Sequence, residues 1–434
     1  MENKEKLGNF TCNDAPKYED ILQCMRCGFC LPTCPTFSLT GRERSSPRGR
    51  VALARAVAEG KLEFNQAMKE EAFFCLDCRA CTTACPSGVQ AGSLMEICRA
   101  QVSQQHPLPK WQAGFRDFIL KKMLPNPDLL ETSMLPARLY QKLGIQWLVR
   151  NSKILKLGPE WINKAEGMMP ELHQPLRQQL PELSPATGEK RGTVAFFLGC
   201  VMTLMYAEVS RQTVKVLNHQ GFDVITPKAQ KCCGAPHMTE GDPETARQLA
   251  SHNLDLFLDL EVDAIVTDCA GCGAALKEYE EMLAEREDHK RLDLFHSKIK
   301  DISEFLVEVG IRTEGLKPVN KVVTYHEPCH LCHAQGISKQ PREVIKSIPG
   351  IELREMKEAS WCCGSAATFS LKFTEESQKI LDRKLDNVKN TEAEVLVTSN
   401  PGCHLQLDWG LRKAEMSQPV LHLCELLGEA TPDQ

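Results

Sequence analysis

The pattern of apolar and polar residues divides the chain into a helical first part and a second part in which strands and helices alternate. An Ala-rich run over 51–59 ends at Gly60, and a further run covers 65–74, so both predict short helices. The helical pattern ends near Gln105, where closely spaced prolines follow. The first part is therefore expected to be a mostly helical module.

From Thr193 onward, short runs rich in β-branched and aromatic residues predict strands. These strands are expected over 193–198, 222–226, 263–267, 321–326 and 394–399, and helices over 203–219 and 243–260. Such alternation is typical of βαβ units around a buried parallel sheet. The fold class predicted for this part is α/β.

Cysteines in the second part occur twice in the same order. The offsets between the copies are 129 from Cys200 to Cys329, 130 from Cys232 to Cys362, and 131 from Cys272 to Cys403. Offsets so nearly constant indicate that one ancestral unit was used twice. Two related α/β domains are expected, over 193–315 and 316–434.

The region 106–192 differs from both parts in its residue composition. Apolar and aromatic residues between Trp111 and Trp147 alternate with lysines and arginines, although the whole chain has a net charge of -5. One interpretation is a helical linker packed between the modules, and the other is an amphipathic surface that contacts an anionic membrane. Residues 166–192 are rich in Pro and Glu and are expected to form a connector.

Length, charge and composition limit the number of domains, the class of partner and the cellular location that are expected. The 434 residues allow two to four domains at roughly 150 residues each. The mild net charge gives no reason to expect nucleic acid, and no apolar run approaches the roughly 18 residues of a membrane span. The N-terminus lacks an apolar signal region, so the 21 cysteines are expected to stay reduced in the cytoplasm.

Two copies of one cysteine motif dominate the first hundred residues. The copies are Cys24, Cys27, Cys30 and Cys34, followed by Pro35, and Cys75, Cys78, Cys81 and Cys85, followed by Pro86. This spacing is the signature of two-cluster bacterial ferredoxins. Zinc sites pair two CxxC halves and do not need eight cysteines with two following prolines, and disulfides need an oxidising compartment. Residues 1–105 are therefore expected to form a ferredoxin-type domain with two [4Fe-4S] clusters.

The fourth cysteine of such a motif reaches the other cluster. By that rule Cys24, Cys27, Cys30 and Cys85 hold one cluster, and Cys75, Cys78, Cys81 and Cys34 hold the second.

The duplicated cysteines of the α/β part indicate further metal or cluster ligation. The first copy has Cys200, Cys232, Cys233, Cys269 and Cys272, and the second has Cys329, Cys362, Cys363 and Cys403. Adjacent thiols suit a site that bridges several irons better than a single zinc ion. In the second copy Asn400 replaces one cysteine, so the site holds a depleted cluster, or Cys332 or a histidine substitutes, or the site is structural.

One further motif and three single cysteines complete the set. Cys329 to His333 matches the haem-attachment string CxxCH, but haem attachment requires export, and Cys329 already has a repeat counterpart. Cys12, Cys98 and Cys424 stand outside every pattern and are expected to be ordinary thiols.

With these motifs in view, the chain resembles the iron-sulfur subunits of bacterial glycolate oxidase, within the wider heterodisulfide-reductase-like CCG-domain family. The resemblance is carried by the tandem ferredoxin motif, Ser46-Pro-Arg-Gly-Arg50, Cys85-Pro-Ser-Gly-Val89, Tyr325-His-Glu-Pro-Cys329, Cys362-Cys-Gly-Ser365 and Asn400-Pro-Gly-Cys403. It covers nearly the whole length and implies two CCG domains.

The resemblance implies an oxidoreductase subunit that relays electrons. A separate FAD-containing subunit would oxidise a 2-hydroxy acid such as glycolate, and the electrons would pass through clusters to a quinone or another acceptor. In heterodisulfide reductases the CCG domains carry noncubane [4Fe-4S] clusters with five cysteine ligands, and Cys200, Cys232, Cys233, Cys269 and Cys272 match that set. The second site, with Asn400, departs from it.

No residue of this chain is expected to act as a catalytic group, because no dinucleotide-binding GxGxxG follows a strand and no Ser-His-Asp or paired-carboxylate constellation stands out. Three alternatives stay open: the corresponding subunit of anaerobic glycerol-3-phosphate or lactate dehydrogenase, a heterodisulfide reductase-like enzyme, and a zinc-stabilised scaffold.

Overall fold

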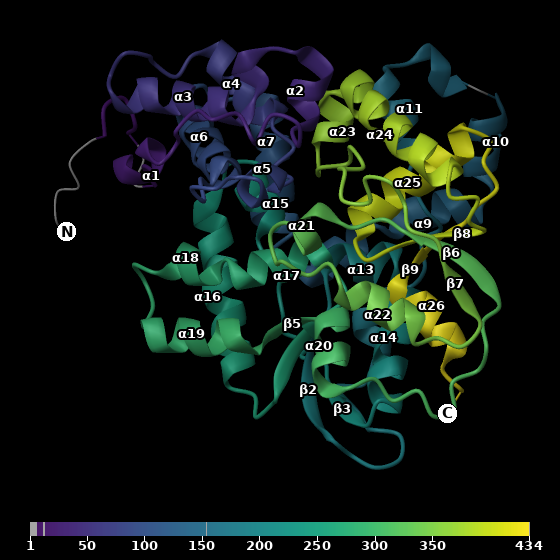
Figure 1. Ribbon diagram of the computed structural model, residues 1–434. Coiled ribbons are helices and arrows are strands. Elements are labelled where there is room, and N and C mark those ends of the chain that lie inside the picture. Colours follow the sequence, from purple (N-terminus) through teal and green to yellow (C-terminus); the bar gives the residue numbers. More distant parts are fainter. Residues whose placement is uncertain (1–6, 12–13, 153, 434) are drawn as a thin grey trace.

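The computed structural model describes residues 7–11, 14–152 and 154–433 (Figure 1). Its first part is helical, as predicted. The elements are α1 (Tyr18–Leu22), α2 (Pro35–Thr40), the 3-10 turn η1 (Glu43–Ser45), α3 (Pro47–Ala58), α4 (Gln66–Phe74), α5 (Ala80–Thr83) and α6 (Ala91–Gln105). The two helices expected over 51–59 and 65–74 are α3 and α4, and α3 begins four residues earlier than expected.

Side-chain caps explain where α3 and α4 begin. The Ser46 hydroxyl accepts a hydrogen bond from Gly49 N–H at 3.0 Å, and Pro47 occupies the first turn of α3. The Asn65 carbonyl oxygen accepts from Met68 N–H at 3.0 Å and caps α4. Both helices pack on a small core that includes Phe10 and Phe64, whose ring centroids are 5.1 Å apart.

Short helices connect this module to the α/β part. They are α7 (Lys110–Asp117), the π-helical turn η2 (Phe118–Met123), α8 (Pro127–Ser133), α9 (Leu135–Lys142), α10 (Ile145–Ser152), η3 (Ile154–Leu157), α11 (Glu160–Gly167) and α12 (Leu176–Gln179). Leu120 and Leu130 are buried, whereas α7, α9 and α10 bury none of their described residues. No helix among the described residues is long and apolar enough to cross a membrane.

The first α/β domain, called the first CCG domain after the resemblance noted above, contains a five-stranded sheet. Its elements are β1 (Leu183–Ser184), β2 (Gly192–Phe197), α13 (Cys200–Met205), α14 (Ala207–His219), β3 (Phe222–Ile225), α15 (Ala235–Thr239), α16 (Pro243–Leu258), β4 (Ala264–Thr267), α17 (Ala270–Lys277), α18 (Tyr279–Leu283), α19 (His289–Lys298), β5 (Ile299–Asp301) and α20 (Ile302–Val309). The strand order is β1-β3-β2-β4-β5, and only β1 runs antiparallel to its neighbour.

The second CCG domain repeats this arrangement with a parallel four-stranded sheet. Its elements are β6 (Lys321–Tyr325), α21 (Cys329–Cys332), α22 (Gln340–Lys346), β7 (Ile351–Leu353), α23 (Phe369–Lys372), α24 (Thr374–Lys389), β8 (Val395–Thr398), α25 (Pro401–Lys413), β9 (Val420–His422) and α26 (Leu423–Ala430). The strand order β7-β6-β8-β9 corresponds to β3-β2-β4-β5 in the first domain. The mixed α/β fold with a helical N-terminal module agrees with the prediction.

Some elements differ from the expectation. The helix expected over 203–219 is two helices, α13 and α14, which meet at Tyr206, and the connector over 166–192 contains α12 and the edge strand β1. The short strands β5, β7 and β9 were not predicted either. Each has three residues, too few to show a strand pattern.

The two CCG domains meet where β4 and β8 end. Ala270 N–H donates to the Ser399 carbonyl at 3.1 Å, and the Gln335 amide donates to the Ala270 carbonyl at 2.9 Å. In Figure 1 the helical module (purple) lies on one side of this junction, and α17 and α21 lie between the module and the sheets. The loops that follow the strands therefore face both the partner domain and the helical module.

Candidate iron-sulfur centres

The two ferredoxin motifs form loops with the same backbone shape. Arg26 and Gly28 in the first loop have φ of 58° and 91°, and Asp77 and Arg79, at the matching positions of the second, have φ of 51° and 58°. These left-handed residues turn the backbone tightly, so that the first three thiols of each motif face one cavity. The equivalence of the loops reflects their identical cysteine spacing.

Each loop lines its own cavity, and the fourth cysteine of each motif lies in the cavity of the other. The first cavity is lined by Cys24, Cys27, Cys30 and Cys85, and the second by Cys75, Cys78, Cys81 and Cys34. Cys81 also borders the first cavity, so the two cavities are neighbours. This placement is the one that the ligand exchange predicted from the sequence requires. The ligation itself stays a prediction.

The stretch Ser46 to Arg50 supplies one arginine to each cavity. Arg48 lines the first cavity, where its guanidinium donates to the Arg26 carbonyl at 3.2 Å and pairs with Glu43 at 2.6 Å. Arg50 lines the second cavity and is only 2% exposed. In the sequence this stretch stands out only through the family resemblance. Arg48 and Arg50 are two residues apart on one turn of α3, and this spacing was the available signal that they contact different cavities.

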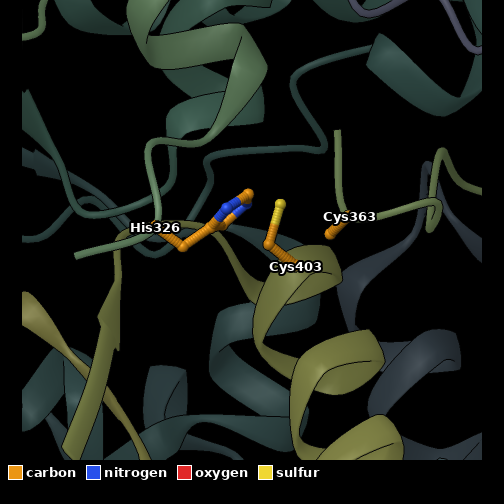
Figure 2. A group of neighbouring side chains, drawn as sticks. All are labelled: His326, Cys363 and Cys403. Carbon is orange, nitrogen blue, oxygen red and sulfur yellow. The ribbon is translucent and has the colours of Figure 1, made fainter. Parts of the chain in front are cut away.

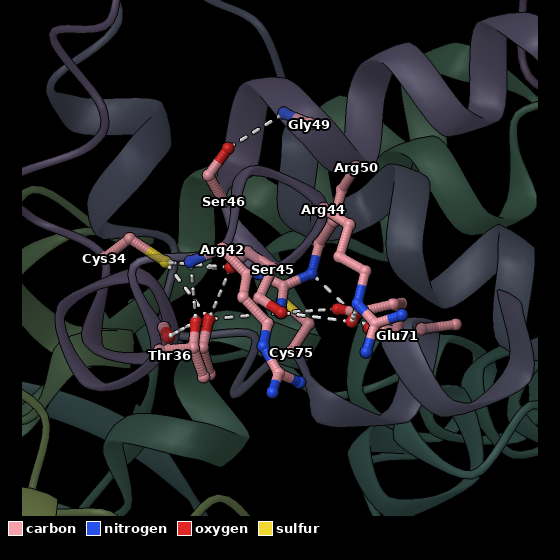
Figure 3. Close-up of polar contacts among 12 residues, drawn as sticks. Cys34, Thr36, Arg42, Arg44, Ser45, Ser46, Gly49, Arg50, Glu71 and Cys75 are labelled. Carbon is pink, nitrogen blue, oxygen red and sulfur yellow. Dashed lines mark hydrogen bonds and ion pairs between the residues drawn. The ribbon is translucent and has the colours of Figure 1, made fainter. Parts of the chain in front are cut away.

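Arg50 is the centre of a buried polar network around Cys34 (Figure 3). Its guanidinium lies 4.0 Å from the Cys34 sulfur and donates to Thr36 Oγ1 at 3.1 Å, and the Cys34 sulfur lies 3.2 Å from the same hydroxyl. Glu71 pairs with Arg50 at 3.9 Å and with Arg44 at 2.9 Å. A buried cation beside a cysteine favours the thiolate and an anionic cluster.

Burial opposes the charge of Arg50, but the nearby thiols of Cys75 and Cys34 and the Glu71 carboxylate raise its pKa. Burial likewise raises the pKa of Cys81 to about 12, with contributions from Cys75 and Cys34. Crowded thiols of this kind cannot all ionise unless a metal neutralises them. The electrostatics of the second cavity therefore suit a cationic iron-sulfur core.

A buried ion network joins the second cysteine loop to the first CCG domain. Arg79 pairs with Asp77 at 3.0 Å, with Glu96 at 2.9 Å and with Glu278 at 3.4 Å. Glu278 caps α17, whose first turn carries Cys272. The side chains of Asp77, Arg79 and Glu96 are at most 8% exposed, so this network fixes the ferredoxin module on the α/β part.

The first CCG site brings together the five cysteines that the sequence predicted. Cys200 begins α13, Cys232 and Cys233 precede α15, and Cys269 and Cys272 lie at the start of α17. The Cys200 and Cys232 sulfurs are 3.8 Å apart, and Cys272 N–H donates to the Cys269 sulfur at 3.4 Å. Gly234, with φ of 92°, permits the turn that follows the adjacent pair.

Contacts between these thiols shift their pKa values in opposite directions. A hydrogen bond with Cys232, followed by burial, raises the pKa of Cys200, and a hydrogen bond with Cys233 raises the pKa of Cys272. Hydrogen bonds from Cys232 and Cys272 lower the pKa of Cys233. Five thiols so close together match a site that binds several metal ions.

The second CCG site contains four aligned thiols and a histidine. Cys329 contacts Cys362, Cys362 contacts Cys363, and Cys363 contacts Cys403. His326, just after β6, has a ring nitrogen within 4.8 Å of the Cys363 and Cys403 sulfurs. Figure 2 shows the His326 ring beside the Cys403 thiol. The sequence allowed a histidine as a substitute ligand without indicating which one, and the fold places His326 with Cys363 and Cys403.

Two buried lysines lie beside the second CCG site. Lys384 donates to the Glu358 and Ala359 carbonyls at 2.5 and 3.0 Å, and burial lowers its pKa to about 8. Lys164, on α11 of the linker, donates to Ser377 Oγ at 2.9 Å, and burial also lowers its pKa to about 8. Ser377 in turn donates to the carbonyl of Gly364, which follows Cys363. Buried ammonium groups favour a negatively charged site nearby.

The four centres form a connected series. Cys81 borders both ferredoxin cavities. Burial, together with the nearby Cys362 and Cys329 thiols of the second CCG site, raises the pKa of Cys78 in the second cavity. The second and first CCG sites meet at Asn400, whose side-chain oxygen accepts from Gly271 N–H at 3.1 Å and lies 4.0 Å from the Cys269 sulfur.

The remaining cysteines lie apart from these sites or make other contacts. The Cys332 thiol donates to the Cys329 carbonyl at 3.9 Å. Cys98 and Cys424 are buried in hydrophobic clusters, and Cys12 lies outside the described residues.

Family models match part of the helical module, part of the linker and part of each α/β domain. Residues 20–89 match the 4Fe-4S dicluster domain, residues 111–169 match the linker region of glycolate oxidase iron-sulfur subunits, and residues 194–277 and 323–408 each match the cysteine-rich domain CCG. The same family describes both α/β halves, which confirms the predicted repeat.

Three relatives and one solved structure illustrate the range of similarity. The probable glycolate oxidase iron-sulfur subunit of Bacillus subtilis (strain 168) is 39% identical over 95% of this chain and 94% of its own. The glycolate oxidase iron-sulfur subunit of Escherichia coli (strain K12) is 29% identical over 88% and 89%. Lactate utilization protein A of Halalkalibacterium halodurans is 29% identical over 54% of this chain and 96% of its own. A hypothetical protein from Helicobacter pylori has a TM-score of 0.42 and 13% identity over 79% of this chain and 68% of its own.

The alignment with the Bacillus subtilis relative spans nearly the full length of both chains, so it includes the tandem ferredoxin motif, the linker and the two CCG domains of this chain. The chain belongs to the family of glycolate oxidase iron-sulfur subunits.

Proposed function

We propose that this iron-sulfur subunit relays electrons from an FAD-containing subunit that oxidises glycolate to glyoxylate. The observation that carries the proposal is the series of four neighbouring cysteine centres, which would give electrons a route through one chain once clusters are bound. The names of the full-length relatives support glycolate as the substrate of the complex.

The balance of the reaction explains why such a subunit is needed. Oxidation of glycolate releases two electrons and two protons, which a flavin accepts together, whereas each bound cluster accepts and passes one electron at a time. The protons leave to water, and a quinone that receives both electrons takes up two protons to become a quinol. We propose a quinone as the acceptor, with other acceptors as the alternative.

We assign the ligands as the sequence predicts. Two [4Fe-4S] clusters would be held by Cys24, Cys27, Cys30 and Cys85, and by Cys75, Cys78, Cys81 and Cys34; a noncubane cluster would be held by Cys200, Cys232, Cys233, Cys269 and Cys272. The protein's own contribution is to hold these thiols in buried cavities and to place Arg48 and Arg50 beside them. Cations near a cluster stabilise its reduced, more negative state.

The substrate is tested with the chain co-expressed with its candidate FAD partner and kept anaerobic. Glycolate is expected to produce the EPR signal of reduced [4Fe-4S] clusters, and lactate and glycerol 3-phosphate are expected to produce none. A signal with lactate alone would move the assignment to lactate dehydrogenase, the alternative supported by the lactate utilization relatives. Reduction by none of the three would contradict the proposal.

A second candidate function is disulfide reduction at the first CCG site. It is favoured by the five-cysteine set, which matches the one that heterodisulfide reductases use. Turnover of a disulfide by the dye-reduced chain distinguishes this activity from electron relay.

We also propose that the surface of α9 and α10 contacts an anionic membrane. Leu143, Trp147 and Leu148 are 69%, 70% and 59% exposed, and the basic residues Lys142 and Arg150 lie on the same helices. Exposed aromatic and aliphatic side chains flanked by cations are typical of interfacial helices. The linker is held to the α/β part by a hydrogen bond between the Leu120 carbonyl and His237 and by the bond from Lys164 to Ser377. The apolar side chains of α9 and α10 stay exposed.

Flotation with anionic liposomes at low salt tests this surface. The double substitution Trp147→Ser/Leu148→Ser is expected to reduce bound protein at least tenfold, because burying each large apolar side chain contributes about 1.5–3 kcal/mol and 1.4 kcal/mol is about tenfold. Leu294→Ser, at a 50% exposed leucine of α19, serves as the matched control and should float normally. A wild-type chain that stays in the dense fraction would contradict the membrane contact.

A further inference from the structure

His326 is a buried side chain whose ring makes no hydrogen bond of good geometry with the described residues. It is 1% exposed, and neither ring nitrogen has a partner for such a bond among the described residues. The Ala359 carbonyl lies beside the ring but already accepts from Glu327 N–H at 3.1 Å and from Lys384 at 3.0 Å. Leaving a buried polar group unsatisfied costs about 1–3 kcal/mol, so such a group calls for an explanation.

The side chains around His326 are metal ligands by type. One of its nitrogens and the sulfurs of Cys363 and Cys403 all lie within 4.8 Å of one another (Figure 2). Two such atoms bound to one metal ion, each at about 2.0–2.3 Å, lie roughly 3.5 Å apart, so a small inward movement is sufficient. Imidazole and thiolate also share the irons of one cluster in Rieske centres.

The internal repeat shows which residue His326 replaces. Val194 pairs with Ala264 in the first sheet, and Val323 pairs with Val395 in the second, so the two sheets can be aligned by register. In that alignment His326 corresponds to Phe197, which is fully buried in the apolar core.

The same alignment matches the missing ligand. Asn400 corresponds to Cys269, the first cysteine of the CxxC at the start of α17. The domain that keeps all five cysteines therefore has phenylalanine at the histidine position, and the domain that lost one cysteine has histidine there. One potential ligand is lost and another is gained within a single site.

The other replacements considered from the sequence make different contacts. The Asn400 side chain accepts from Gly271 N–H at 3.1 Å, and its amide nitrogen lies 3.5 Å from the Cys403 sulfur, where it donates to the sulfur. The Cys332 thiol donates to a backbone carbonyl. Among the described residues, His326 is the side chain that joins Cys363 and Cys403 in a compact ligand group.

We propose that His326 is an iron ligand of a cluster in the second CCG site, together with Cys329, Cys362, Cys363 and Cys403. The inference rests on the proposed iron-sulfur content of this domain and not on the identity of the substrate. A neutral imidazole in place of a thiolate makes the cluster less negative by one charge, which raises its reduction potential relative to a cluster held by five thiolates. The amide of Asn400 stabilises the Cys403 thiolate by a hydrogen bond.

The test uses the full chain purified anaerobically and reduced with dithionite, so that neither glycolate nor a partner is needed. With 15N-labelled histidine, pulsed EPR of the wild type is expected to show a histidine nitrogen coupled to a cluster. His326→Ala is expected to lose this coupling and the iron and sulfide of one cluster. His326→Cys is expected to restore the iron but not the nitrogen coupling.

A buried histidine of the same domain provides the matched control. His404 follows Cys403, is 9% exposed and packs against the Tyr206 ring, with the ring centroids 4.6 Å apart and the ring planes tilted by 36°. His404→Phe should keep both the iron and the nitrogen coupling. The proposal fails if the wild type shows no histidine coupling, if His326→Ala keeps its full iron, or if the site contains zinc in place of iron. Because glycolate is absent, these results stay separate from the outcome for the proposed function.

Discussion

Cys85→Ala is expected to remove the cluster of Cys24, Cys27 and Cys30, although Cys85 belongs to the other motif. The reason is geometric, because Cys85 lines the first cavity and Cys34 the second. A [4Fe-4S] cluster needs four ligands, so an alanine leaves one iron without a protein ligand. Iron and sulfide analysis of the anaerobic protein should show the loss of one cluster per chain, and glycolate-dependent electron transfer should be abolished. Cys98→Ala, at a buried cysteine of the same module, should keep all the iron.

Double substitutions identify which cluster is lost. If the fourth cysteines are exchanged, Cys85→Ala combined with Cys24→Ala removes one cluster, because both residues belong to the same site. Cys85→Ala combined with Cys75→Ala removes two. The opposite pattern would show that each motif holds its own cluster and would contradict the ligand assignment.

Arg50→Met is expected to destabilise the ferredoxin module by about 3 kcal/mol, because it leaves Glu71 and the anionic second cluster without a buried cation. It should also lower the reduction potential of that cluster, since a nearby positive charge stabilises the reduced state. Anaerobic urea unfolding and a redox titration followed by EPR measure the two effects.

Arg48→Met provides the comparison within the same helical turn. The Arg48 side chain is 30% exposed and pairs with Glu43, which is 55% exposed, so water can replace much of its charge interaction. Its stability effect should be clearly smaller, and any shift in potential should fall on the first cluster. Equal effects of the two substitutions on stability would contradict the role assigned to the buried Arg50.

Much of the fold could be predicted from local patterns. The strands β2, β3, β4, β6 and β8 have four to six residues and are rich in apolar and β-branched side chains, so their residue pattern indicated them. The strands β1, β5, β7 and β9 have two or three residues and lie at or toward the sheet edges, where pairing with a neighbour and not residue pattern defines them. Tyr206 divides an otherwise continuous helical pattern, which no local signal indicated.

The sequence by itself determined the family, the two cysteine-based modules and the repeat, because metal-ligand spacing and internal offsets are properties of the chain order. The tertiary structure alone decided how these parts meet. Arg48 and Arg50 are two residues apart but serve different cavities, whereas His326 and Cys403 are far apart and face one site. Residues two apart on an α-helix point to different sides, which separates the two arginines. The parallel neighbours β6 and β8 bring the histidine and the cysteine to the same edge of the sheet.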